Sequence, residues 1–351
     1  MNVLFLIHTE YHLMVIASFI QQYFREQDKF NVYVIIQVDP NKSRFKFKID
    51  PKLLGAKEII VVQTAKDNFV YDYKIKEAIN EVMNRKYIEY ISFLEQTALN
   101  FYFVSKLRKT GCKICLAPEG TKPYINITKF AIGSRLKATI NNYRFLIAQK
   151  LYISDLYFVS NRNGFLKHTD EVWINHAESY SNITRKKVVP VDVLKDKEAI
   201  YAVSKLFNFD VTDHFCKTDG IILYLNHWVV EFKIYDYEIK MLETIRSMYP
   251  DKPIHIKLHP STHEFQLKRL EKIQGIEINR STIPAELFIA SISNSIIFSF
   301  WSASLLLQNE SCKFYWCHKL LEKEGVMMDW WSIVNPTKHI KEVESIEQIK
   351  F

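Results

Sequence analysis

The chain has 351 residues, which is long enough for two domains that each bury a core. Apolar residues make up 48% of it and charged residues 25%, ordinary proportions for a globular protein, and no run approaches the ~18 consecutive apolar residues of a membrane span. Lys and Arg outnumber Asp and Glu by 47 to 39, for a net charge of +8, but no nucleic-acid-binding motif accompanies this excess. Only eight glycines occur, and neither Gly-rich phosphate-loop pattern is present.

Apolar runs with strand character alternate with helical patterns through the first half of the chain. Strands that lack long polar alternation and are separated by helices are typical of a parallel sheet covered on both faces. We predict strands at Val3–Ile7, Val32–Ile36, Ile59–Gln63, Ile88–Phe93, Lys113–Leu116 and Leu156–Ser160, and helices at Tyr11–Phe24, Tyr73–Asn84 and Leu99–Lys109.

The alternation breaks around residues 185–197 and resumes at Ile221. We therefore predict an α/β fold with two Rossmann-like, doubly wound domains, residues 1–190 and 191–335, followed by a C-terminal tail at 336–351. Two such domains facing a central cleft describe the architecture called GT-B. The second domain has predicted strands at Ile221–Leu225, Ile254–Leu258, Ile276–Ile278, Ser295–Phe300 and Lys313–Trp316, and helices near Glu231–Met248, Glu264–Ile273 and Ala285–Ile289.

The cysteines and the N-terminus indicate a reduced, cytoplasmic protein. Cys112 and Cys115 have C-x-x-C spacing inside a predicted strand, and no second pair completes a zinc site, so we read all five cysteines as reduced thiols and expect no metal. The apolar run Val3–Ile7 is short, is followed by polar residues and has no basic residue before it, which argues against a signal peptide.

A basic amphipathic stretch extends from Lys122 to Lys150. No acidic residue occurs between Gly120 and Ser154, and apolar and aromatic residues are interleaved with the six basic ones. Such a stretch predicts peripheral contact with an anionic membrane at the inner face of the cell membrane, or guidance of an acidic substrate. A solvated positive face above ordinary core residues is the alternative.

The segment Ile256–Ser261 offers a candidate phosphate site. Alternating apolar residues predict a strand that delivers Lys257 and His259 at its carboxyl end, where open α/β sheets bind their ligands. One residue separates the two basic groups, so strand periodicity points both to the same side, and Pro260 ends the strand. A cation beside an imidazole suits a phosphate that must leave.

Glu119 is a candidate general base. It follows the predicted strand Lys113–Leu116, in the tight turn 117–121, and is the only carboxylate between Glu95 and Asp155. The alternative role is that of a turn residue or a carboxylate at a helix N-terminus.

Candidate residues also follow three further predicted strands. Ser302 and Ser304 follow a buried strand at a helix start, where free N–H groups and hydroxyls bind phosphate, although plain N-capping by Ser302 would explain the pattern as well. Thr9 is a candidate substrate contact at the exit of the first strand. Asn226 is a candidate donor contact at the end of Ile221–Leu225.

Together these motifs resemble the signature set of bacterial sialyltransferases, most closely the lipooligosaccharide sialyltransferases and the capsular polysialyltransferases. Residues 118–121 correspond to the acidic-acidic-Gly motif, with Thr121 following as in the polysialyltransferases, but Pro118 replaces the first acid. His259-Pro260, preceded by Lys257, corresponds to the His-Pro motif. Residues 302–305 correspond to the serine motif, with its two serines split by Ala303.

The resemblance implies a GT-B glycosyltransferase that moves sialic acid from CMP-sialic acid to a glycan hydroxyl of lipooligosaccharide or capsule, with inversion and without a metal. Glu119 would take the acceptor proton alone. Protonated His259 would assist the leaving phosphate, and Lys257 with the serine hydroxyls would stabilise its developing charge. The absence of an Asp-x-Asp motif fits charge neutralisation by side chains. Gly120 and Thr121 would contact substrate.

Other functions stay open at this point. The same architecture could move another CMP-activated nonulosonic or octulosonic acid, or a CDP-alcohol. A UDP-sugar transferase or epimerase is less favoured, because the Gly-rich loops and the Glu-rich nucleotide motif of those enzymes are missing. A non-catalytic scaffold in capsule or lipopolysaccharide assembly, docked through Lys122–Lys150, would explain the eroded acidic motif. The motifs do not discriminate among acceptors, linkages or oligomeric states.

Overall fold

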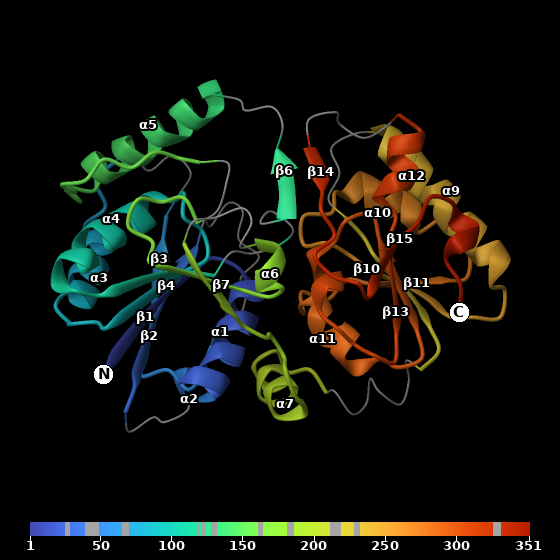
Figure 1. Ribbon diagram of the computed structural model, residues 1–351, viewed down its shortest axis with the longest axis horizontal. Coiled ribbons are helices and arrows are strands. Elements are labelled where there is room, and N and C mark those ends of the chain that lie inside the picture. The colour runs from blue at the N-terminus through green and yellow to red at the C-terminus, as the bar shows by residue number, and fades with distance from the viewer. Residues whose placement is uncertain are drawn as a thin grey trace. The chain divides into compact units, whose positions relative to one another are not determined.

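The computed structural model describes residues 1–24, 29–38, 49–64, 70–117, 120, 124–127, 132–160, 164–180, 186–210, 219–227, 232–325 and 331–351. Its contacts divide the chain into two compact units, Met1–Leu206 (unit 1) and Phe207–Phe351 (unit 2). Each unit is built on its own parallel sheet (Figure 1).

Unit 1 contains a seven-stranded sheet in the order β3-β2-β1-β4-β5-β7-β8. Every neighbouring pair of strands is parallel, so all the carboxyl ends lie at one edge. The strands are β1 (Asn2–Ile7), β2 (Asn31–Val38), β3 (Glu58–Gln63), β4 (Glu89–Ser92), β5 (Lys113–Leu116), β7 (Glu171–Ile174) and β8 (Lys187–Pro190); the short strand β6 (Ile125–Ile127) is separate from this sheet.

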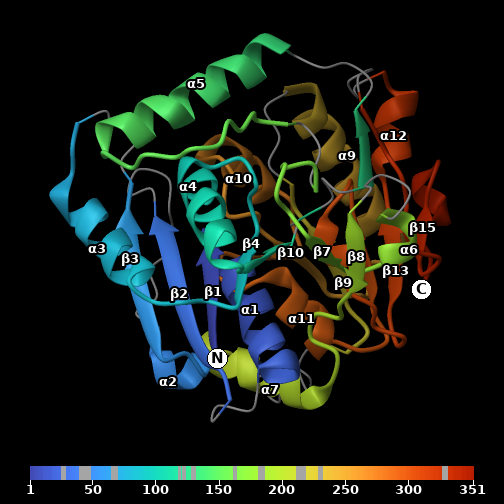
Figure 2. The same cartoon turned by 60° about the vertical axis from the view of Figure 1, so that its left-hand side comes forward.

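Helices cover both faces of the unit 1 sheet. Alternate side chains of β1 separate the two cores: Leu4 and Leu6 belong to a cluster with residues of α3, α4 and α5, whereas Phe5 packs on Phe24 at the end of α1 with ring centroids 5.9 Å apart. Figures 1 and 2 show α5 as the outermost helix of the α4 side. The helical elements are α1 (Glu10–Tyr23), α2 (Pro51–Leu54), α3 (Tyr73–Met83), α4 (Ala98–Leu107), η1 (Arg108–Thr110), α5 (Ile132–Ala148), α6 (Ala177–Tyr180) and α7 (Lys197–Leu206).

Unit 2 contains a six-stranded parallel sheet in the order β11-β10-β9-β12-β13-β15. Its strands are β9 (Ile222–Leu225), β10 (Ile254–Lys257), β11 (Ile276–Asn279), β12 (Ile296–Ser299), β13 (Lys313–Trp316) and β15 (Ile340–Glu342); β14 (Trp331–Ile333) lies outside this sheet. The helical elements are α9 (Phe232–Met248), α10 (Glu264–Leu270), α11 (Ala285–Ser291), η3 (Ala303–Leu306), α12 (His318–Lys323) and η4 (Ile346–Gln348).

The predicted α/β class with two Rossmann-like parallel sheets is confirmed. One predicted strand, Leu156–Ser160, is wrong: this segment is extended but runs beside α5, outside the sheet. Its N–H groups bond to side chains of α5, since Tyr157 N–H donates to Tyr143 Oη at 2.7 Å and Val159 N–H donates to Thr139 Oγ1 at 3.0 Å. The sheet continues instead with β7 and β8.

The observed division of the chain differs from the predicted boundary at residues 190 and 191. Residues up to Leu206 belong to unit 1, because α7 packs against α1 and α2. Residues 336–351, predicted as a tail, contribute β15 to the sheet of unit 2, and Tyr249 Oη donates a 2.7 Å hydrogen bond to the carbonyl of Ile349.

Candidate functional site at the carboxyl end of the second sheet

Three neighbouring strands of unit 2, β10, β9 and β12, end side by side. The ladder pairs Lys257 with Leu225 at the ends of β10 and β9, and Phe298 of β12 with Tyr224 of β9. The polar residues that follow these strands therefore gather at one sheet edge, the usual ligand position in an open α/β sheet.

Lys257 ends β10 and is only 5% exposed. Its ammonium donates hydrogen bonds to the carbonyls of Ser281 at 2.6 Å and Leu258 at 3.3 Å. Burial lowers the pKa of Lys257 to about 8, and this effect is partly offset by the carboxylate of Glu286. At neutral pH the group is mostly charged but poorly hydrated, which favours binding of an anion.

His259 lies in a turn directly after β10. Pro260 occupies the second position of this turn, which closes through a 2.9 Å hydrogen bond from Thr262 N–H to the carbonyl of His259. Ser261 N–H donates to His259 Nδ1 at 3.1 Å, so a neutral ring carries its proton on Nε2. Because the strand ends at Lys257, the turn sets the direction of this half-buried ring, not the strand alternation that the sequence suggested.

His227 follows Asn226 at the end of β9, a position expected to face the ligand, but no role was predicted for this histidine. Trp301 donates its indole N–H to His227 Nε2, and the two rings lie 4.4 Å apart between centroids. Burial and the neighbouring His259, whose ring is 5.9 Å away, lower the pKa of His227 to about 3. The ring is thus neutral at physiological pH and carries its proton on Nδ1. The only signal in the sequence was the position of His227 and Trp301 shortly after two predicted strands, Ile221–Leu225 and Ser295–Phe300.

Asn226 links β9 to the turn after β10 through buried hydrogen bonds. It is 4% exposed, its Nδ2 donates to Glu238 Oε1 at 2.7 Å, and the Thr262 hydroxyl lies 2.7 Å from its Oδ1. Glu238 is buried and also accepts hydrogen bonds from Tyr224 Oη and Gln266 Nε2, at 2.7 and 2.8 Å. Asn226, which the sequence predicted to contact the sugar-nucleotide donor, therefore belongs to a buried hydrogen-bond network that fixes the turn after β10.

The two predicted serines make hydrogen bonds inside the protein. Ser302 caps η3 by accepting from Ser304 N–H at 3.3 Å, as in the alternative reading of this motif. The Ser304 hydroxyl donates to Glu286 Oε1 at 2.8 Å. Donation from Ser304 to a phosphate would require this bond to break, whereas the half-buried Ser302 hydroxyl has a proton that its capping role does not use.

In unit 1 the candidate base Glu119 lies outside the described residues, as do Pro118 and Thr121. Gly120 is described and has φ +69°, a left-handed conformation that favours glycine. Thr9 caps α1, because its hydroxyl accepts from His12 N–H at 3.2 Å.

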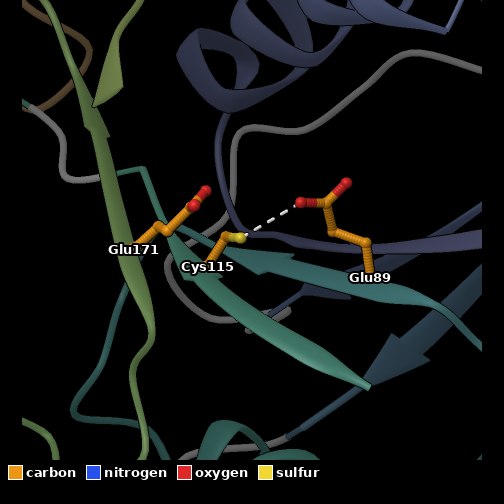
Figure 3. A group of neighbouring side chains, drawn as sticks. All are labelled: Glu89, Cys115 and Glu171. Carbon is orange, nitrogen blue, oxygen red and sulfur yellow. Dashed lines mark hydrogen bonds between the residues drawn. The ribbon is translucent and has the colours of Figure 1, made fainter. Parts of the chain in front are cut away.

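A cluster of metal-ligand type lies in unit 1, away from the carboxyl ends of the strands. Glu89, Cys115 and Glu171 come from the adjacent strands β4, β5 and β7, and the potential ligand atoms lie within 4.8 Å of one another (Figure 3). The two carboxylates are already paired with ammonium groups, since Lys113 contacts both at 3.3 and 2.6 Å and Lys187 contacts Glu171 at 2.5 Å. This arrangement fits a structural ion network better than a metal site.

These two parallel-sheet α/β units define the fold class as GT-B, as predicted. Among solved structures, the chain is similar to the UDP-GlcNAc 2-epimerase of Neisseria meningitidis bound to UDP-GlcNAc, with a TM-score of 0.51 and 12% identity, covering 85% of this chain and 77% of that one. It is also similar to the GT-B domain of a sialyltransferase from Photobacterium damselae, with a TM-score of 0.50 and 10% identity, covering 90% and 91%. No family model and no curated protein matches the sequence. At these identities the likeness shows the fold.

Proposed function

We propose that this protein is an inverting, metal-independent sialyltransferase that moves sialic acid from CMP-sialic acid to a hydroxyl of a surface glycan, lipooligosaccharide or capsule. The GT-B fold and the order of the three motifs along the chain support this proposal. We also propose that the protein is cytoplasmic, because its donor would be a nucleotide-activated sugar.

The observation that carries the proposal is that one ammonium and two imidazoles follow or end the adjacent strands β9 and β10, with the two imidazole rings 5.9 Å apart. Transfer breaks the bond between the anomeric carbon and the phosphate oxygen of CMP, so the phosphate leaves with one more negative charge. Lys257 stabilises that charge, and His259 donates a hydrogen bond or proton from Nε2. The Nδ1–H of neutral His227 supplies a further donor, and Ser302 assists through its hydroxyl.

Glu119 is the proposed general base. As the acceptor oxygen bonds to the anomeric carbon, the hydroxyl proton passes to the Glu119 carboxylate and then to solvent. The positive φ of Gly120 supports a tight turn that holds this carboxylate after β5. Thr9 and Thr121 are proposed substrate contacts.

The decisive experiment measures CMP release from CMP-sialic acid in EDTA, with and without a galactoside-terminated or oligosialic acid acceptor. Acceptor-dependent release is expected. We expect Glu119→Gln to lower turnover about 100-fold or more while CMP binding stays near that of the wild type, and His259→Ala to weaken both. His255→Ala is the matched control, because His255 lies in β10 but at the start of the strand, next to Glu277.

Other outcomes would overturn parts of the proposal. Release only from a different CMP-activated nonulosonic or octulosonic acid would replace the donor but keep the phosphate site. If the protein turned over UDP-GlcNAc, the proposed sialyl transfer would be wrong and a reaction on that UDP-sugar would take its place. If the folded protein bound CMP but released none from any donor, or bound no nucleotide, a scaffold role in capsule assembly would be the better account.

A further inference from the structure

Helix α5 carries an exposed apolar stripe along its length. Ile132, Leu136, Ile140 and Ile147 are 70%, 53%, 49% and 66% exposed. At 100° per residue, these positions fall within one 80° sector of the helix, so their side chains form one row. Eight of the nineteen exposed large apolar side chains of the described residues lie between 132 and 165, which makes this the most concentrated apolar surface there.

A neighbouring face of α5 already packs on unit 1. Leu146 is buried in the core shared with α3 and α4, and Asn142 Nδ2 donates to the carbonyl of Gln96 at 2.8 Å. The neighbouring segment bonds to Tyr143 and Thr139 on the helix. The exposed row therefore cannot turn inward without breaking these contacts.

The segment beside α5 adds a second set of exposed apolar side chains. Residues 156–159 alternate: Tyr157 and Val159 are buried, whereas Leu156 and Phe158 are 64% and 61% exposed. A solvated loop would ordinarily place polar groups at such outward positions, and here they are large and apolar.

The charged side chains of α5 have one sign. Exposed Lys137 and Arg144 lie on the side of α5 next to the apolar row, at helical angles 40–60° beyond Ile140, and Lys150 follows the helix. No acidic residue occurs between Gly120 and Ser154. An apolar row beside cationic side chains is the pattern of a helix that lies in the plane of an anionic lipid surface.

We propose that α5 and the adjoining residues Leu156 and Phe158 form a docking surface for an anionic membrane. The apolar row would enter the boundary between headgroups and acyl chains, with Lys137 and Arg144 at the level of the lipid phosphates. Among the residues that the structure describes, no helix is long and apolar enough to span a bilayer. This surface is independent of the proposed reaction.

A lipid surface accounts for both the apolar row and the cationic side chains of α5. Other partners account for only one of these features or are disfavoured by the other. A polyanionic glycan would be recognised by Lys137 and Arg144 but would gain nothing from exposed isoleucines and leucines. A second copy of the chain would have to bring the same cationic helix against itself in a symmetric interface, placing like charges together.

The test is co-sedimentation of the full chain with vesicles of phosphatidylcholine, with and without phosphatidylglycerol. We expect binding that requires phosphatidylglycerol and weakens with salt. The double variant Leu136→Glu/Ile140→Glu should lower the partition coefficient by more than about tenfold, since each apolar side chain withdrawn from lipid accounts for roughly a factor of ten. Lys137→Glu/Arg144→Glu should lower it at least about fivefold.

Two control variants make the result specific. Leu53→Glu changes an exposed leucine on α2, and Lys197→Glu/Lys205→Glu changes the net charge equally through α7; neither should alter vesicle binding. Circular dichroism and thermal unfolding confirm that each variant is folded. The proposal fails if vesicle binding is absent, or if the control charge variant weakens it as much as the α5 variants do. Light scattering that shows a dimer lost in Leu136→Glu/Ile140→Glu would assign the surface to a second copy instead.

Discussion

The ammonium of Lys257 donates a 2.6 Å hydrogen bond to the main-chain carbonyl of Ser281, and this bond ties the end of β10 to the residues after β11. The charge is thereby fixed at the sheet edge without a carboxylate within ion-pair distance among the described residues. An ammonium that is held by neutral carbonyls, and not by a direct ion pair, stays available to an incoming anion.

The affinity for CMP should fall as pH rises through about 8. The protonated form of Lys257 binds the phosphate, and its pKa in the free protein is about 8, so each pH unit above that value should cost up to about tenfold in affinity. Isothermal titration calorimetry of CMP from pH 6.5 to 9.5 measures this. Lys257→Met should bind weakly with a flat profile over this range, and Lys252→Met, which changes a partly exposed lysine at the opposite end of the sheet, should keep the wild-type profile. A wild-type affinity that does not change between pH 7 and 9.5 would remove Lys257 from the phosphate site.

Trp301→Phe should allow His227 to populate both neutral tautomers. The substitution keeps an aromatic ring beside His227 but removes the indole N–H that bonds to His227 Nε2. Loss of this partly buried hydrogen bond should lower the free energy of unfolding by about 1 kcal/mol. Long-range ¹⁵N NMR of the imidazoles should show the Nδ1–H form in the wild type and a mixture in the variant. Turnover should fall several-fold more than CMP affinity; an unchanged ratio would leave Trp301 a purely structural role.

Gly120→Ala should damage activity more than stability. At φ +69° an alanine costs about 1 to 2 kcal/mol, and no atom within 4 Å would clash with its Cβ. If this turn positions Glu119, the strain should lower turnover at least tenfold. Gly111→Ala is a close control, because Gly111 stands at the other end of β5 with φ +77° and equally open space. Equal effects of both substitutions on turnover would show that the turn at Gly120 has no special role.

Acid should weaken unit 1 through Glu171. Burial opposes its ionisation, but hydrogen bonds from Lys113, Lys187 and Trp173 prevail and lower its pKa from 4.5 to about 2. Its contribution to stability is therefore complete above about pH 4.5 and is lost as pH falls toward 2. We expect about 2 kcal/mol from this group, discounted because both lysines are partly exposed. Urea denaturation between pH 2.5 and 6 should show a smaller acid dependence for Glu171→Gln than for the wild type.

The fold was predictable because both sheets are parallel and buried. Segments such as Val3–Ile7 and Ile254–Leu258 are short apolar runs that helices separate, and this pattern leaves little choice of architecture. Leu156–Ser160 has the same local pattern but lies outside the sheet, since Thr139 and Tyr143 of α5 bond to its N–H groups. That outcome depends on a helix whose apolar residues face outward, a feature that periodicity alone does not reveal.

The candidate site was predictable only where one strand end carries several groups. Lys257 and His259 stand out in the sequence because two residues of chemical interest follow a single apolar run. His227 acquires its tautomer from Trp301, 74 positions later, and Ser304 acquires Glu286 as a partner from another helix. Such pairings arise from the order of strands in the sheet, which the sequence analysis did not predict.

The buried cysteines give each unit an internal chemical reporter. In unit 1, Cys112 directly precedes β5 and Cys115 lies in that strand, and in unit 2 Cys317 follows β13; all three are free thiols whose pKa burial raises. Alkylating reagents react with the exposed thiolate, so modification of each cysteine should wait for the opening of its own sheet. Mass spectrometry of labelled peptides can therefore compare the two opening rates in one unmodified chain, and a ligand that binds unit 2 alone should slow only the labelling of Cys317.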